Sequence, residues 1–155
     1  MEYNNIIANL EKLVGADLPA FKSLTIGRKL KLINQDIAGY IKSKNKVNYY
    51  TNKTNKLGAE DLSSKFHYME LLSSTRGRLR IGSLSKDEQF DFVEMMEKRL
   101  KTALKSINPK VLEDEYDFII SGCTMAIAIE DEDLKQRLKL IKEDCSQLLE
   151  NPFGM

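Results

Sequence analysis

The chain has 155 residues and a net charge of +1, with 42% hydrophobic and 30% charged residues. This length suits one domain, and the high charge content is typical of helical proteins. Two cysteines are too few for a disulfide scaffold, and no apolar stretch is long enough to span a bilayer. We therefore expect a soluble cytoplasmic protein with reduced thiols and no membrane partner.

The small net charge conceals two halves of opposite sign. Residues 1–81 hold 14 basic and 7 acidic side chains, a net charge of +7. Residues 82–155 hold 10 basic and 16 acidic side chains, a net charge of −6. A basic half followed by an acidic half suits an anion-binding face. It suits equally well an attraction between the halves, within one chain or between copies.

Two helices are predicted at the start of the basic half. Apolar residues recur at spacings of three and four over residues 3–14, and Gly15 is a natural stop. A short turn is then predicted over residues 17–19. A second helix begins near Ala20 and continues past Tyr40 with the same apolar spacing.

The next stretch, residues 42–58, is dominated by Asn, Lys and Thr and is predicted to be a loop or a frayed helix end. A third helix is predicted over residues 58–79, with arginines near its C-terminus, where positive charge suits the helix dipole. Gly82 ends this helix.

The acidic half begins with the clearest helix start in the chain. Ser85 and Glu88 have the spacing of a capping box. The apolar pattern that follows continues to Ile107, where Asn108-Pro109 breaks it. A last helix is predicted over residues 131–149, because acidic residues crowd its first turn, where negative charge is favourable.

The segment between these helices, residues 111–129, fits two structures. A helix here would begin with acidic residues and then be apolar nearly all round, like a buried central helix. A β-hairpin over 117–129, with Ser121-Gly122 as its turn, is the alternative. The acidic start and the alanine and methionine content favour the helix. We therefore expect an all-α fold, a single-domain bundle of five or six helices over residues 1–155, with the β-hairpin as the minority alternative.

The sequence offers little material for catalysis. His67 is the only histidine, and on a helix it would share a face with Glu70 as a polar pair or as a base with its orienting carboxylate. Apolar surroundings around Cys123, and an acid beside Cys145, disfavour a thiolate. One histidine and two distant cysteines make no zinc pattern, and no glycine loop suits a phosphate. We predict a non-enzymatic protein with no catalytic residue, no metal site and no cofactor.

One group of basic and aromatic residues has the chemistry of a binding surface. Basic side chains surround two tyrosines in residues 42–56, and three arginines follow at 76–80. Lysine and arginine neutralise phosphates and exposed tyrosines stack on unpaired bases, so the pattern suits single-stranded DNA or RNA better than a duplex. The predicted nucleic-acid-binding residues are Lys42, Lys44, Lys46, Tyr49, Tyr50, Lys53, Lys56, Arg76, Arg78 and Arg80.

The placement of these residues depends on how the second and third helices pack. If they form a hairpin, the 42–56 segment lies at its tip and the arginines return towards its other end. Both ends of the hairpin would then be basic, with Asp36 and Glu70 between them. A solvated loop without any function would have the same lysine-rich composition.

Two functional hypotheses remain open at this point. The first is an accessory protein that binds single-stranded nucleic acid through the basic, tyrosine-bearing segment. The second is an adaptor, inhibitor or structural subunit whose acidic helices bind a protein partner, with no nucleic acid involved. Spare apolar surface on the fourth and fifth helices predicts self-association, most simply as a symmetric dimer.

Overall fold

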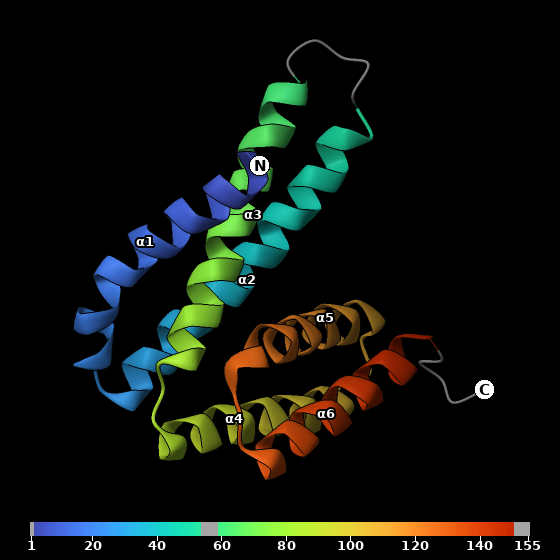
Figure 1. Cartoon of the computed structure of the whole chain (residues 1–155). Helices are drawn as coiled ribbons and strands as arrows, with labels where there is room; N and C mark the ends of the chain where they lie inside the picture. Colours follow the sequence, from blue (N-terminus) through green and yellow to red (C-terminus); the bar gives the residue numbers. More distant parts are fainter. Residues whose placement is uncertain (1, 54–58, 151–155) are drawn as a thin grey trace. The chain divides into compact units, whose positions relative to one another are not determined.

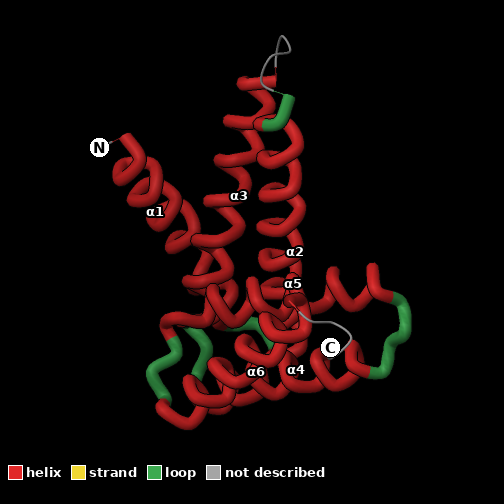
Figure 2. Tube along the Cα trace, turned by 90° about the vertical axis from the view of Figure 1, so that its right-hand side faces the viewer, coloured by secondary structure: helices red, strands yellow, loops and turns green. Residues whose placement is uncertain are grey.

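The computed structural model describes residues 2–53 and 59–150, and all its regular structure is helical (Figure 1). The chain divides into two compact units, residues 1–80 and 81–155. This division falls one residue from the change in charge sign, and Ile81 is uncharged, so unit 1 carries the +7 and unit 2 the −6. The predicted all-α fold is confirmed. Figure 2 shows helices joined by loops, with no strand in the described residues.

Unit 1 consists of α1 (Glu2–Lys22), α2 (Ile26–Thr51) and α3 (Ala59–Gly82), whose last two residues fall in unit 2. α2 and α3 form an antiparallel hairpin. Near its tip, Thr51 Oγ1 lies 3.2 Å from Ser63 Oγ. Midway along, a Cβ added to Gly39 would lie 3.0 Å from Ser73 Oγ, so the two backbones approach closely there.

α1 is longer than the sequence indicated. The predicted stop at Gly15 and the turn over 17–19 are wrong, because the helix continues through Pro19 to Lys22. Val14 and Phe21, on either side of these residues, are both buried. Burial of such side chains is worth more than the roughly 1 kcal/mol that a helical glycine costs. Tertiary packing thus overrides the local stop signal.

α2 begins later than predicted and, as expected, continues past Tyr40, ending at Thr51. Its N-cap is Thr25, whose hydroxyl accepts a hydrogen bond from the Arg28 N–H at 3.4 Å, so residues near Ala20 belong to α1. The loop or frayed end predicted over 42–58 is wrong for residues 42–51, which are regular helix. The reason is packing on α3. Ser43 is buried, and the ring of Tyr50 stacks on Phe66 at 5.7 Å with an interplanar angle of 2°. Residues 54–58 lie outside the described part of the chain.

Unit 2 contains α4 (Lys86–Leu104), α5 (Pro109–Met125), the short 3₁₀ helix η1 (Ala126–Ala128) and α6 (Glu132–Glu150). The predicted capping box is confirmed, because Ser85 Oγ accepts from the Glu88 N–H at 3.3 Å and Glu88 Oε1 accepts from the Ser85 N–H at 3.0 Å. The helix predicted within 111–129 is also confirmed, and the β-hairpin is excluded. The Asn108-Pro109 break is the start of α5, with Asn108 as its N-cap.

Arginine–carboxylate pairs join the three long helices of unit 2 around a buried core. Arg99 bonds Glu115 at 3.0 Å between α4 and α5, and Arg137 Nε bonds Glu97 Oε2 at 3.0 Å between α6 and α4. This bond lowers the pKa of Glu97. The fully buried side chains between the helices include Phe92, Val93, Met96, Ile119, Ile129 and Cys145.

Candidate nucleic-acid interface on α2

The exposed side of α2 carries a row of cations. The residues are spaced by three, four or eleven positions, which places them on one face of a helix. We call this row the α2 basic face. Its members are Arg28, Lys31, Lys42, Lys46, Tyr49 and Lys53, the last lying just beyond the helix. The gap between Lys31 and Lys42 is filled on the same face by uncharged, exposed Gln35 and Ala38. From Arg28 to Tyr49 the row extends about 30 Å along the helix.

No carboxylate interrupts the α2 basic face, because the only acid in α2 points the other way. Asp36 is 5% exposed and accepts a hydrogen bond from Arg80 Nη1 at 2.9 Å. Burial raises the pKa of Asp36 to about 6, although Arg80 and Arg76 act to lower it. The sequence placed Asp36 between two basic ends of the hairpin. In the structure it lies buried against α3 and leaves the outer face of α2 uniformly positive or neutral.

The two tyrosines of the segment have different surroundings. Tyr50 is half-buried and packs flat on Phe66, so its ring serves the α2–α3 contact. Tyr49 is 53% exposed and meets Tyr50 edge-on at 5.0 Å. Lys53 Nζ lies 5.3 Å from the centre of the Tyr49 ring. Tyr49 is therefore the ring available for stacking on a ligand, with a cation beside it.

The structure separates the other predicted lysines. Lys42 and Lys46 are exposed on the α2 basic face. Lys44 is half-buried, and its Nζ lies 5.7 Å from the centre of the Tyr40 ring. Lys56 lies outside the described residues. The described part of the hairpin tip thus contributes Lys42, Lys46 and Lys53 to one face.

The three predicted arginines belong to the opposite end of the hairpin, as the sequence suggested, and they act within unit 1. Arg80 pairs with Asp36, and its guanidinium lies 5.4 Å from the Phe21 ring. Arg78 pairs with Glu11 of α1 at 3.2 Å. Arg76 is half-buried and lies close enough to Asp36 to lower its pKa. These contacts join α3 to α1 and α2, and they place the arginines apart from Tyr49.

Sequence reasoning did not include Arg28 and Lys31 in the candidate site. Counting back from Lys42 in steps of four and three reaches Ala38, Gln35, Lys31 and Arg28. This spacing indicates a common helix face only if residues 42–51 continue the helix. The predicted loop therefore hid the continuity of the face.

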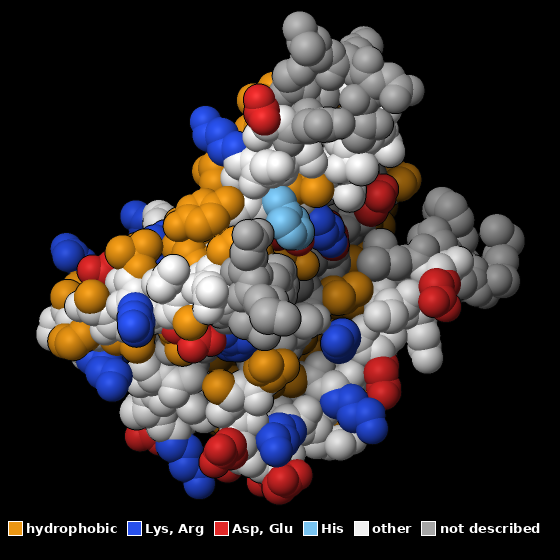
Figure 3. Space-filling model, turned by 45° about the horizontal axis from the view of Figure 1, so that its top comes forward, with side chains coloured by type: hydrophobic (Ala, Val, Ile, Leu, Met, Phe, Trp, Pro, Cys, Tyr) orange, Lys and Arg blue, Asp and Glu red, His pale blue; other side chains and the backbone are white. Residues whose placement is uncertain are grey.

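The candidate catalytic groups are an exposed histidine beside a glutamate and two buried thiols. His67 Nδ1 lies 3.5 Å from Glu70 Oε2, and the histidine, pale blue in Figure 3, is at the surface of unit 1. Both cysteines are free and buried, as predicted. Burial raises the pKa of the Cys123 thiol to about 12 and that of Cys145 to about 11, so neither is a thiolate at neutral pH. Among the described residues, no three His, Cys, Asp or Glu side chains gather as metal ligands.

No protein-family model, curated protein or solved structure matches this chain. Within residues 2–53 and 59–150, no helix has the length and apolar composition that crossing a membrane requires. The candidate site therefore depends on the geometry and charge of α2 alone.

Proposed function

We propose that this protein is a non-enzymatic accessory factor that binds single-stranded DNA or RNA along the α2 basic face. The observation that supports this function is the outer face of α2, where five cations and an exposed tyrosine lie in line with no carboxylate among them. A polyanion with regularly spaced charges is the ligand that such a row suits best, because the protein's cations replace the counterions condensed on the phosphates and release them into solution.

The number of cations sets the expected salt dependence. If all five contact phosphates, the logarithm of the binding constant falls with the logarithm of salt concentration at a slope of about −3.5 for a single strand. Arg28 and Lys31 are three residues apart and Lys42 and Lys46 are four apart, or about 4.5–6 Å. Lys46 and Lys53 are seven residues apart, with Tyr49 between them. The shorter spacing is comparable to the distance between successive phosphates of a strand, so these two pairs suit consecutive nucleotides.

Tyr49 supports a preference for single strands. An unpaired base has a free π-face, and stacking on an aromatic side chain contributes about 1–3 kcal/mol per base. The bases of a duplex are already stacked on each other and offer this ring nothing except at the ends. We therefore expect single-stranded oligonucleotides to bind more tightly than duplexes of equal length.

The test is fluorescence-anisotropy titration of labelled single-stranded and duplex oligonucleotides at several salt concentrations. The variant Lys42→Glu/Lys46→Glu reverses two exposed charges on the face. The matched control, Lys135→Glu/Lys139→Glu, reverses two exposed lysines with the same four-residue spacing on α6. Both variants change the net charge equally, so long-range electrostatics alone would weaken binding by the same amount in each.

For the wild type, the logarithm of the binding constant should fall with the logarithm of salt concentration at a slope of about −3.5. For the α2 variant, which loses two cations, the slope should be shallower by at least about 1.4. The α6 variant should keep most of its affinity. An equal loss in both variants would indicate nonspecific attraction and refute the assignment to α2. Absence of binding at low salt would refute nucleic-acid binding itself.

A further inference from the structure

Charge is unevenly distributed within unit 2. Residues 98–112 carry five cations and no carboxylate, whereas the rest of the unit carries five cations and 16 carboxylates. The cationic stretch covers the end of α4, the turn that follows it and the start of α5. Lys98, Arg99 and Lys110 pair with carboxylates just outside this stretch or within α5, Glu94, Glu115 and Asp114. Among the described residues, Lys101 and Lys105 are the two cations of this end that are not held in such a pair.

This basic end also exposes apolar side chains. Ile107, in the turn between α4 and α5, is 97% exposed, and Leu104 and Val111 on either side are 54% and 45% exposed. We call this feature the basic corner. Its members are Lys101, Leu104, Lys105, Ile107, Lys110 and Val111, all exposed. The turn is fixed by Lys105 as the C-cap of α4 and by Asn108-Pro109 as the start of α5. An isoleucine held at the apex of a fixed turn gains free energy when a partner covers it.

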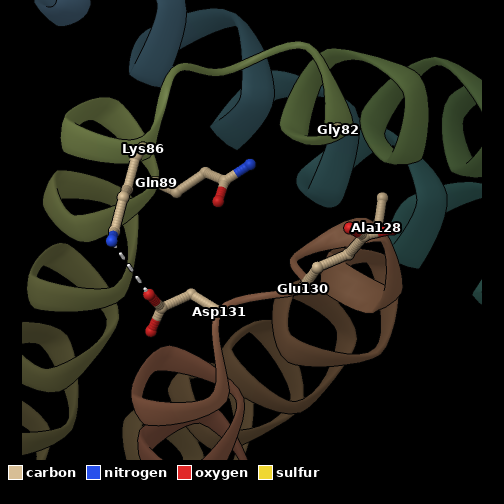
Figure 4. A pocket seen from close by; sticks show the side chains of 6 residues that line it. All are labelled: Gly82, Lys86, Gln89, Ala128, Glu130 and Asp131. Carbon is tan, nitrogen blue, oxygen red and sulfur yellow. Dashed lines mark ion pairs between the residues drawn. The ribbon is translucent and has the colours of Figure 1, made fainter.

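The opposite end of the unit contains an open recess of about 610 Å³. Its lining residues are Gly82, Lys86, Gln89, Ala128, Glu130 and Asp131 (Figure 4). We call it the acidic recess, because the carboxylates of Glu130 and Asp131 line it, and exposed Glu132 and Asp133 follow them in the sequence. Lys86 Nζ lies 3.5 Å from Asp131 Oδ2, so this lysine of the recess pairs with Asp131 and not with Glu130.

The corner and the recess lie at opposite ends of α5, as Figure 1 shows for the turns that precede and follow this helix. α5 has 17 residues. It is therefore about 25 Å long. The basic corner of a unit cannot reach its own acidic recess. Helix dipoles account for acids in the first turns of α4 and α6, but they do not account for an apolar side chain as exposed as Ile107.

We infer that the basic corner of one copy of this chain docks at the acidic recess of a second copy. Three features identify the occupant. Lys101 and Lys105 of the corner complement Glu130 and Asp133 in sign, exposed Ile107 stands at a turn where the recess is hollow, and both surfaces are exposed on the same chain. Lys110 and Glu132 contribute less, because they pair with Asp114 and Lys135 within the unit. The contact uses different surfaces on the two partners, so it is heterologous and joins copies head to tail.

Sedimentation velocity of nucleic-acid-free protein over a range of concentrations tests this inference. Ile107→Asp/Lys105→Glu blocks the corner, and Glu130→Lys/Glu132→Lys blocks the recess while keeping Asp131, which caps α6. Leu140→Asp/Lys139→Glu is the control for the corner variant, because Leu140 is an exposed apolar residue of α6 beside an exposed lysine. Circular dichroism confirms that each variant keeps its helices.

The wild type should increase in average mass with concentration, and added salt should reduce the increase. Each blocked variant alone should remain monomeric, and a mixture of the two should form a 1:1 complex, because one intact corner and one intact recess remain. The control variant and Lys42→Glu/Lys46→Glu should associate like the wild type. A monomeric wild type at high concentration, or blocked variants that associate normally, would overturn the inference.

Discussion

Replacement of Asp36 by asparagine tests how the buried carboxylate beneath the α2 basic face contributes to stability. Its pKa rises from 3.8 to about 6 on folding, because burial outweighs the attraction of Arg80. The folded protein therefore holds the proton more tightly than the unfolded chain does. A raised pKa contributes stability that is fully present below about pH 3.8 and is lost as the pH rises through about 6.

The magnitude follows from the difference between the two pKa values. A difference of about two units corresponds to about 3 kcal/mol of unfolding free energy, lost between about pH 4 and pH 7. The measurement is urea denaturation of wild type and Asp36→Asn across this range. The difference between the two proteins isolates Asp36, because other carboxylates titrate alike in both.

Asp36→Asn should gain stability relative to the wild type as the pH rises, by about 3 kcal/mol over the full range. A constant difference between the two proteins would mean that the pKa is not shifted. A difference that changes in the opposite direction would mean that the ion pair with Arg80 outweighs burial. Either result would refute the balance of forces described for this site.

Three further predictions concern single residues. Tyr49→Ala should weaken single-strand binding by roughly 5- to 150-fold with an unchanged salt slope, whereas Tyr68→Ala, at an exposed tyrosine of α3, should have no such effect in the same titration. Ser85→Ala should lower the unfolding free energy by about 1 kcal/mol in urea denaturation, and no loss would argue against the capping box. Cys123 and Cys145 should react with a thiol reagent only as fast as the protein unfolds, and rapid labelling of the native protein would contradict their burial.

The elements that the sequence predicted well are those with local signals. The capping box joins Ser85 to Glu88 within a single turn, so four residues of sequence contain the whole interaction. The break at Asn108-Pro109 is equally local. Both features were predicted without any knowledge of what packs against them.

The errors occurred where distant contacts decide the structure. The composition of residues 42–51 predicts a loop, yet the ring of Phe66, far along the chain, receives Tyr50 and extends the helix. Arg80 lies 44 residues from Asp36, so the sequence could not show that this acid is removed from the surface. The α2 basic face depends on both contacts, which is why the sequence yielded its lysines but not its continuity or its first two cations.

The division into units has a consequence for biosynthesis. Each unit is one uninterrupted stretch of chain, so the first is synthesised in full before the second is begun. Unit 2 has 75 residues. At roughly 5–20 residues per second, a ribosome takes about 4–15 s to add them. At the start of this interval the nascent chain carries the net charge of +7 of unit 1, and the 16 carboxylates that balance it are added one by one from Asp87 onwards.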